Sequence, residues 1–122
     1  MNTGLSHTSE LTVEPRHTAL ALGSGDMEVL ATPQMAALME NAAMLAVKDH
    51  LDEGSTTVGS MITTTHLRPT AVGNKVSATA TLTAVEGRKL TFSVTAQDDR
   101  GVIGEGEHVR YIVDRRRFLD KL

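Results

Sequence analysis

Three side chains of this sequence, Thr32, Glu40 and His66, are of the types that nucleophilic chemistry uses. A hydroxyl, a carboxylate and an imidazole together can supply a nucleophile or a water-activating group, a base, and a group that orients the base. Their spacing along the chain does not by itself bring them together. Whether they meet depends on the elements of secondary structure that carry them.

A long apolar segment predicts a helix that carries both Thr32 and Glu40. Thr32 can cap the free N–H groups at its start, Pro33 costs no hydrogen bond there, and Gly54 suits the position just beyond its end. Between residues 35 and 47 the only polar side chains are Glu40 and the asparagine after it. Because this helix is apolar on every side, we expect a sheet to wrap it or a second copy of the chain to cover its far face. A carboxylate on such a helix must be paired or hydrogen-bonded.

Patterns typical of strands occur five times, joined mostly by short turns, over residues 10–22, 57–67, 75–85, 90–96 and 102–113. One strand precedes the helix and four follow it. This order implies an antiparallel sheet with one helix packed on it, an α+β fold. His66 falls near the end of a strand, before a turn, and a histidine there is well placed to be partly exposed in a cleft.

The composition narrows the classes of function. A length of 122 residues argues for a single domain, 1–122, and the absence of cysteine excludes disulfides, thiolate metal sites and a cysteine nucleophile. A net charge of −3, with one Tyr and two Phe, argues against a nucleic-acid partner. The apolar runs are too short to span a membrane, and no secretory signal opens the chain. We therefore expect a cytoplasmic protein with no membrane partner.

The chain resembles the hotdog-fold thioesterases, in particular the branch similar to fluoroacetyl-CoA thioesterase. The resemblance covers almost the whole chain. It rests on the Thr-to-Glu step of eight residues, the Glu-to-His step of 26 residues, a glycine at position 59, the H-x-x-P-x-x-x-G stretch 66–73 and the final strand 104–113. It implies a hotdog fold, with one long central helix wrapped by an antiparallel sheet. It also implies a homodimer, or a higher assembly built from it, with the active site at the dimer interface.

The resemblance assigns roles to the three candidate catalytic residues. Thr32, Glu40 and His66 would hydrolyse an acyl-CoA thioester, with His66 as general acid and base. Glu40 would attack or activate water, and Thr32 would polarise or position the substrate, although which of these two attacks stays open. Gly59 would let the backbone approach the acyl group closely or donate an N–H to it. No metal or redox cofactor is implied, since CoA belongs to the substrate.

Two residues of the last strand are further candidates for substrate binding. His108 and Arg110 share one face of that strand, where they would line the cleft or contact the CoA phosphate. Glu40, His66 and His108 are the residues that could converge on a metal ion, but zinc needs three or four ligands at suitable spacing, and we expect no metal site. We expect His17 to lie on the surface.

Each candidate also has a structural interpretation. Thr32 can be a helix cap, Glu40 a carboxylate bonded to backbone N–H groups, His66 a hydrogen-bonded strand-end histidine, and Gly59 a bulge glycine. The fluoroacetyl-specific enzyme has aromatic lid residues before its threonine, whereas Leu22–Leu30 here contains no aromatic residue. We therefore do not expect selectivity for a fluorinated acyl group, and the sequence leaves the acyl preference of this related thioesterase open. The alternatives are a non-catalytic hotdog module that binds acyl-CoA or another small ligand, and a hotdog dehydratase.

Overall fold

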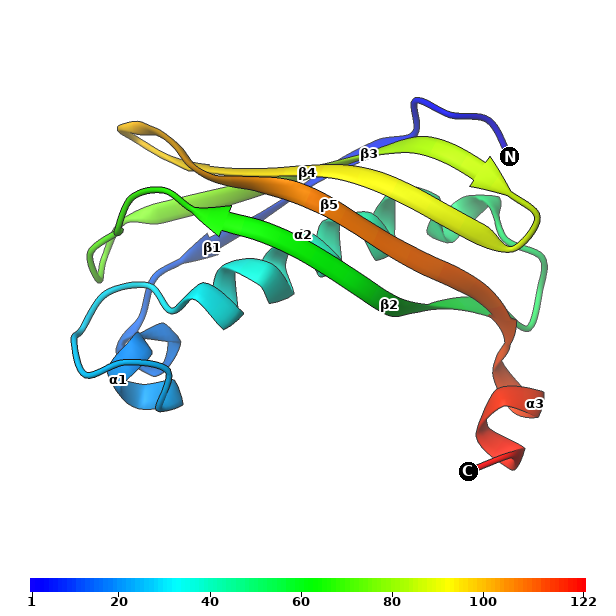
Figure 1. Cartoon of the computed structure of the whole chain (residues 1–122), viewed down its shortest axis with the longest axis horizontal. Helices are drawn as coiled ribbons and strands as arrows, with labels where there is room; N and C mark the ends of the chain where they lie inside the picture. The colour runs from blue at the N-terminus through cyan, green and yellow to red at the C-terminus, as the bar shows by residue number, and fades with distance from the viewer.

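The computed structural model describes all of residues 1–122 and contains five strands and three α-helices (Figure 1). In chain order the elements are β1 (Ser6–Thr12), α1 (Ala19–Leu22), α2 (Thr32–Val47), β2 (Ser55–His66), β3 (Lys75–Glu86), β4 (Lys89–Asp98), β5 (Gly101–Asp114) and α3 (Arg115–Asp120). Two short 3-10 helices, η1 (Pro15–His17) and η2 (Lys48–His50), precede α1 and extend α2.

The strands form one antiparallel sheet in the order β1-β3-β4-β5-β2, and α2 lies along one face of it. This arrangement confirms the predicted α+β fold. The helix packs mainly over β1 and β3. Small residues on its buried side allow the close approach, and the core between helix and sheet includes Met35, Met39, Ala42, Ala43, Val47, Val76, Ala80, Leu82, Phe92 and Val94.

The last four predicted strands are confirmed to within a few residues at either end. Buried positions alternate with less buried ones along most of β3 and β4, whereas β2 and β5 are less regular. On β3, Val76, Ala78, Ala80 and Leu82 all face the core. A bulge follows Leu82 and shifts the register with β4, and the pairing continues from Ala84 to Glu86.

The prediction of a first strand over residues 10–22 was wrong, because the strand is β1 and the chain turns soon after it. Pro15 opens the 3-10 helix η1, and the His17 ring nitrogen Nδ1 accepts a hydrogen bond from the Glu14 N–H at 2.9 Å. Thr18 then caps α1 by accepting from the Ala21 N–H at 3.2 Å. The predicted surface position of His17 was also wrong, since the residue is 4% exposed.

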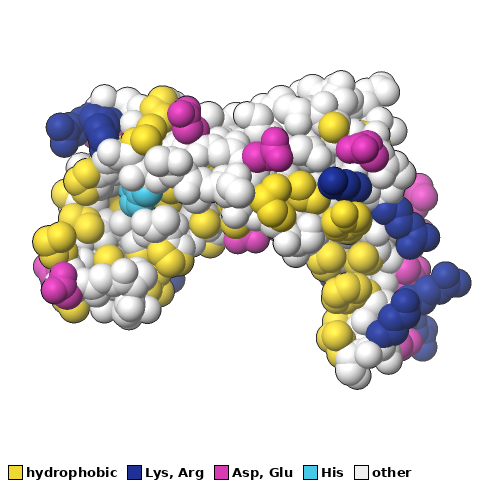
Figure 2. Space-filling model, viewed as in Figure 1, with side chains coloured by type: hydrophobic (Ala, Val, Ile, Leu, Met, Phe, Trp, Pro, Cys, Tyr) yellow, Lys and Arg dark blue, Asp and Glu magenta, His cyan; other side chains and the backbone are white.

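α2 is not covered on all sides within one chain. Ala37 and Asn41 are exposed and Glu40 is half-buried, although the Asn41 Oδ1 atom accepts a hydrogen bond from the Ser9 hydroxyl of β1 at 2.7 Å. Figure 1 shows α1 and α3 projecting to the same side at opposite ends of the molecule, and Figure 2 shows a hollow between them. The strand β2, which has a partner along one edge only, passes across this region. No helix is long and apolar enough to cross a membrane.

Two glycines of β5 allow close approaches, one to α2 and one to the neighbouring strand β2. A Cβ atom at Gly104 would lie 2.6 Å from the Met35 Sδ atom, so the side chain from the helix occupies that space. At Gly106 a Cβ atom would collide with the backbone carbonyl of Thr63 in β2. The strand β5 runs unbroken through both glycines.

We expect Gly106→Ala to lower the free energy of unfolding by about 3 kcal/mol or more, because the β2 backbone would have to move. Urea unfolding followed by circular dichroism measures the change. The matched control is Glu105→Ala on the same strand, where the side chain is exposed and the loss should be about 0.5 kcal/mol or less. Equal losses in the two variants would contradict the close approach at Gly106.

Candidate active site

Thr32 lies at the start of α2 but does not cap it. The capping position is Ala31, and Thr32 is the first helical residue. Its hydroxyl Oγ1 lies 2.8 Å from the His66 Nδ1 atom, which makes a hydrogen bond between helix start and strand end. The interpretation of Thr32 as a helix cap was therefore wrong, and the side chain is available for a site that includes the histidine.

His66 is held where β2 ends. The backbone N–H of Leu67, the next residue, donates to the Ile103 carbonyl of β5 at 2.6 Å. With Nδ1 against Thr32, the other ring nitrogen, Nε2, is buried and has no hydrogen-bond partner in the protein. Burial lowers the pKa of the His66 imidazole below 6.5, opposed by the backbone of Arg68. The ring is thus favoured in its neutral form, which can accept a proton.

A cavity of about 250 Å³ opens beside this pair. Its walls come from the start of α2, the end of β2 and the segment before the helix, and its lining residues are Ala19, Ser24, Val29, Leu30, Thr32, His66, Leu67, Arg68 and Pro69. The free N–H groups of a helix N-terminus favour an anion or a developing oxyanion nearby. A hydroxyl, a neutral imidazole and such N–H groups at one cavity suit the chemistry of a carbonyl centre.

Glu40 belongs to a second group of polar residues. A Cβ atom at Gly59 of β2 would lie 3.1 Å from the Glu40 Oε2 atom, 3.3 Å from His108 Cε1 and 3.4 Å from Arg110 Nη1. The absence of a side chain at Gly59 therefore lets these three groups converge. The register of β2 against β5 also shifts between Gly59 and Met61, so the bulge expected as the structural alternative is present as well.

Arg110 is fixed by contacts on three of its nitrogen atoms. Its Nε donates to Thr57 Oγ1 at 2.8 Å, its Nη2 to the Thr57 carbonyl at 2.9 Å, and its Nη1 to His108 Nε2 at 3.3 Å. Because arginine has no acceptor, the His108 Nε2 atom must carry the lone pair. The proton then resides on Nδ1, which donates to the Met61 carbonyl at 2.7 Å.

The charged and titratable groups His108, Arg110 and Glu40 affect one another electrostatically. Burial lowers the pKa of His108 and the Arg110 charge adds to the shift, while the Met61 carbonyl and the Glu40 carboxylate oppose it, so the neutral form of the ring is favoured. Burial also lowers the pKa of Arg110, opposed by Glu40. A guanidinium keeps its charge in proteins, so Glu40 has a fixed cation beside it.

The predicted site residues therefore form two groups. Thr32 and His66 meet at one cavity, and Glu40 lies with Gly59, with the predicted substrate-binding pair of β5 beside it. Thr32 and Glu40 are eight helical residues apart, a rise of roughly 12 Å, and Glu40 does not line the cavity. One chain does not join the two groups. No three His, Cys, Asp or Glu side chains are arranged to hold a metal ion.

Thr57 is the residue of this region that the sequence analysis missed. It is 6% exposed and makes two of the three hydrogen bonds that hold Arg110. Thr57 stands two positions before Gly59 on β2 and so faces the same side of the strand. The alternation of side chains along this strand was the sequence signal that could have placed Thr57 beside Gly59.

Solved structures match this architecture over almost the whole chain. A variant of the fluoroacetyl-CoA-specific thioesterase FlK, in complex with fluoroacetate and CoA, gives a TM-score of 0.91 at 35% identity and covers 97% of this chain and 99% of that one. A hot-dog-like protein from Thermanaerovibrio acidaminovorans gives a TM-score of 0.89 at 23% identity and covers 99% and 90% of the two chains. These similarities confirm the predicted hotdog fold.

The family follows from the sequence comparisons. Residues 13–116 match the family of fluoroacetyl-CoA-specific thioesterases. The fluoroacetyl-CoA thioesterase of Streptantibioticus cattleyicolor is 39% identical over 95 residues, which are 78% of this chain and 68% of that protein. The chain belongs to this thioesterase family, and the expectation of a thioester-hydrolysing enzyme is confirmed.

We expect the ring protons of His66 and His108 to titrate with midpoints below pH 6.5, because burial lowers both pKa values. In the unfolded chain both rings take up protons near pH 6.5, before the folded chain does. The contribution of the two neutral rings to the free energy of unfolding is therefore fully present above pH 6.5, and it is lost as the pH falls below that value. Carbon-edited NMR measures the midpoints, with His66→Gln to assign the resonances. A midpoint at or above 6.5 for His66 would contradict its burial.

Proposed function

We propose that this protein hydrolyses acyl-CoA thioesters to a free acid and CoA. The observation that carries the proposal is the hydrogen bond between Thr32 and His66 at a cavity beside a helix N-terminus, in a chain of the thioesterase family. The binding of fluoroacetate and CoA by the FlK variant supports CoA as the carrier. Thr32, Glu40 and His66 are the proposed catalytic residues, and Gly59, His108 and Arg110 contribute to binding or to holding Glu40.

In this mechanism each group has a task that its surroundings favour. The Thr32 hydroxyl positions the thioester carbonyl, and the first N–H groups of α2 stabilise negative charge on its oxygen. Glu40 attacks the carbonyl carbon or takes a proton from the water that does so. The proton that leaves the water passes to the neutral His66 ring, and His66 donates that proton to the sulfur of CoA as the C–S bond breaks. Water supplies the oxygen of the acid and both protons, one to the thiol and one released from the acid at neutral pH.

A second copy of the chain is proposed to bring Glu40 to the Thr32–His66 pair. The strand β2 is 12 residues long and has a free edge, which is a template for pairing with another strand. If two copies pair these edges about a two-fold axis, the strands run antiparallel. Gly59, in the first half of β2, then lies beside the second half of the partner's strand, which ends at the partner's His66. Two composite sites result, each with Glu40 from one chain.

The acyl group is proposed to be short. The cavity of about 250 Å³ lies below the usual range for ligand sites and suits a short chain. The segment before Thr32 that forms one wall contains no aromatic side chain. Without a rigid aromatic cover we expect no strong selection for a fluorinated acyl group.

The first test follows thiol release from a panel of short, medium and aryl acyl-CoAs. We expect turnover that is fastest for short acyl groups and that falls at least about 100-fold in Glu40→Gln, because the amide can neither attack nor accept a proton. Glu53→Gln, the same change at an exposed residue, is the control and should keep full activity. No release by a folded protein that still binds acyl-CoA would favour the non-catalytic binding module.

The composite site has its own test, which mixes two inactive variants. Glu40→Gln and His66→Ala chains are combined in equal amounts and allowed to exchange partners. Half of the resulting dimers are then heterodimers. Each heterodimer holds one site with an intact Glu40 and an intact Thr32–His66 pair. We expect about a quarter of the wild-type activity to return, from the symmetry of the dimer. If all three residues act within one chain, the mixture stays inactive although heterodimers are detected by mass spectrometry.

A further inference from the structure

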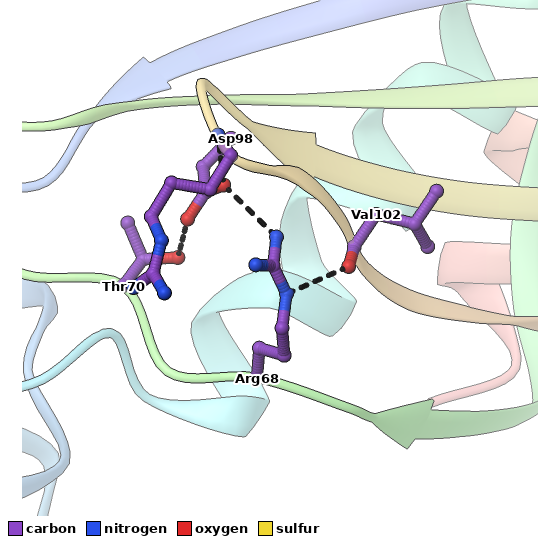
Figure 3. A network of polar contacts seen from close by, with 5 residues as sticks. Arg68, Thr70, Asp98 and Val102 are labelled. Atoms are coloured by element: carbon purple, nitrogen blue, oxygen red, sulfur yellow. Dashed lines mark hydrogen bonds and ion pairs between the residues drawn. The ribbon is translucent and has the colours of Figure 1, made fainter.

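Asp98 is a buried carboxylate that belongs to neither group of the candidate active site. It ends β4, and its side chain is 1% exposed. The carboxylate accepts hydrogen bonds from Thr70 Oγ1 at 2.8 Å and from the Arg100 backbone N–H at 2.8 Å, and it pairs with Arg68 Nη2 at 3.4 Å (Figure 3). A carboxylate that is shielded from water costs free energy unless it is paired. The contacts of Asp98 therefore restrict the local structure.

One set of contacts leads from Asp98 to His66. Arg68 stands two residues after the histidine, and its Nε atom also donates to the Val102 carbonyl of β5 at 3.3 Å (Figure 3). The guanidinium therefore bridges the carboxylate and the backbone of β5. Together these contacts hold the chain at the point where it leaves β2, and so they restrict the position of the His66 ring.

A second set of contacts leads from Asp98 to Thr32. Thr70, which donates its hydroxyl proton to the carboxylate, is 2% exposed. The backbone carbonyl of Thr70 accepts a hydrogen bond from the Leu30 N–H at 2.9 Å. Leu30 lies two residues before Thr32. The segment that leads into α2 is thus held through the same carboxylate that holds the segment after β2.

The carboxylate is charged at neutral pH. Burial raises the pKa of Asp98, but the hydrogen bonds from Thr70 and the Arg100 N–H, with the charges of Arg68 and Arg100, outweigh burial and leave the pKa below its ordinary value. A charged acceptor makes shorter and stronger hydrogen bonds than a neutral one. An amide in its place would also turn donor hydrogens toward groups that are themselves donors.

We propose that Asp98 is a positioning residue for the Thr32–His66 pair. Its carboxylate holds both the segment that precedes Thr32 and the segment that follows His66, and so it sets the geometry between the two side chains. The inference rests on the proposed function for its effect on catalysis. A displacement of about 1 Å between catalytic groups is enough to slow a reaction by about 100-fold. Asp98 does not line the cavity, although its partner Arg68 does, so the loss of Asp98 acts through the positions of its neighbours and removes no direct contact with the substrate.

The test is Asp98→Asn, with Asp99→Asn as the matched control. Asp99 is the neighbouring residue of the same turn, is exposed, and undergoes the same change of charge. For a short acyl-CoA we expect Asp98→Asn to lower kcat about tenfold or more with KM changed by less than about twofold. The ring ¹⁵N shifts of His66, which report its hydrogen bond to Thr32, should change in Asp98→Asn and stay unchanged in the control.

The NMR measurement needs no substrate, so it separates this inference from the proposed function. If no acyl-CoA is hydrolysed but the His66 shifts change in Asp98→Asn, the positioning role stands and the proposed reaction fails. If Asp98→Asn only lowers the melting temperature, with kcat and the His66 shifts unchanged, the positioning role is wrong. Thr70→Val, which removes one hydrogen bond with little change of shape, provides the same readouts if Asp98→Asn does not fold.

Discussion

The structure depends on the need to cover a helix that is apolar on nearly every side. The sheet covers the side of α2 that carries Met35, Met39 and the buried alanines, and Gly104 of β5 leaves the space that Met35 fills. The five strands of one chain leave part of α2 uncovered, so that Ala37 is exposed and Glu40 is half-buried. Glu40 lies close to Gly59 of the edge strand β2. The core, the open hollow and the candidate site are therefore consequences of one packing requirement.

Most of the fold could be predicted because its elements have unambiguous periods. The helix and the four strands after it are long and regular, and hydrophobic burial enforces their patterns. The first strand was misplaced because the apolar residues between Val13 and Leu22 suggest a strand that local polar contacts prevent. The bonds that Glu14 and Thr18 make with nearby backbone and side-chain groups bend the chain there. Apolar pattern alone does not reveal such contacts.

The sequence did not predict which of the candidate site residues lie together in one chain. The spacing of Thr32, Glu40 and His66 pointed to the family to which the chain belongs. Yet Glu40 lies with His108 and Arg110, which depends on how β2 pairs with β5 and on the register shift next to Gly59. Register between distant strands has no local signal in one sequence. The bond of Thr32 to His66 likewise joins residues 34 positions apart.

One wall of the cavity is formed by the segment that precedes α2 in the chain. This wall contributes less to the hydrophobic core than the other walls of the cavity do. The helix α1 within it contains no buried residue, and Leu20 and Leu22 are about half exposed. The other walls belong to the start of α2 and to the chain around His66, which the core and the Asp98 contacts hold. Substitutions in the α1 segment can therefore reshape the proposed acyl site at little cost in stability. Such substitutions can therefore change the substrate range of this protein without changing the sheet or α2.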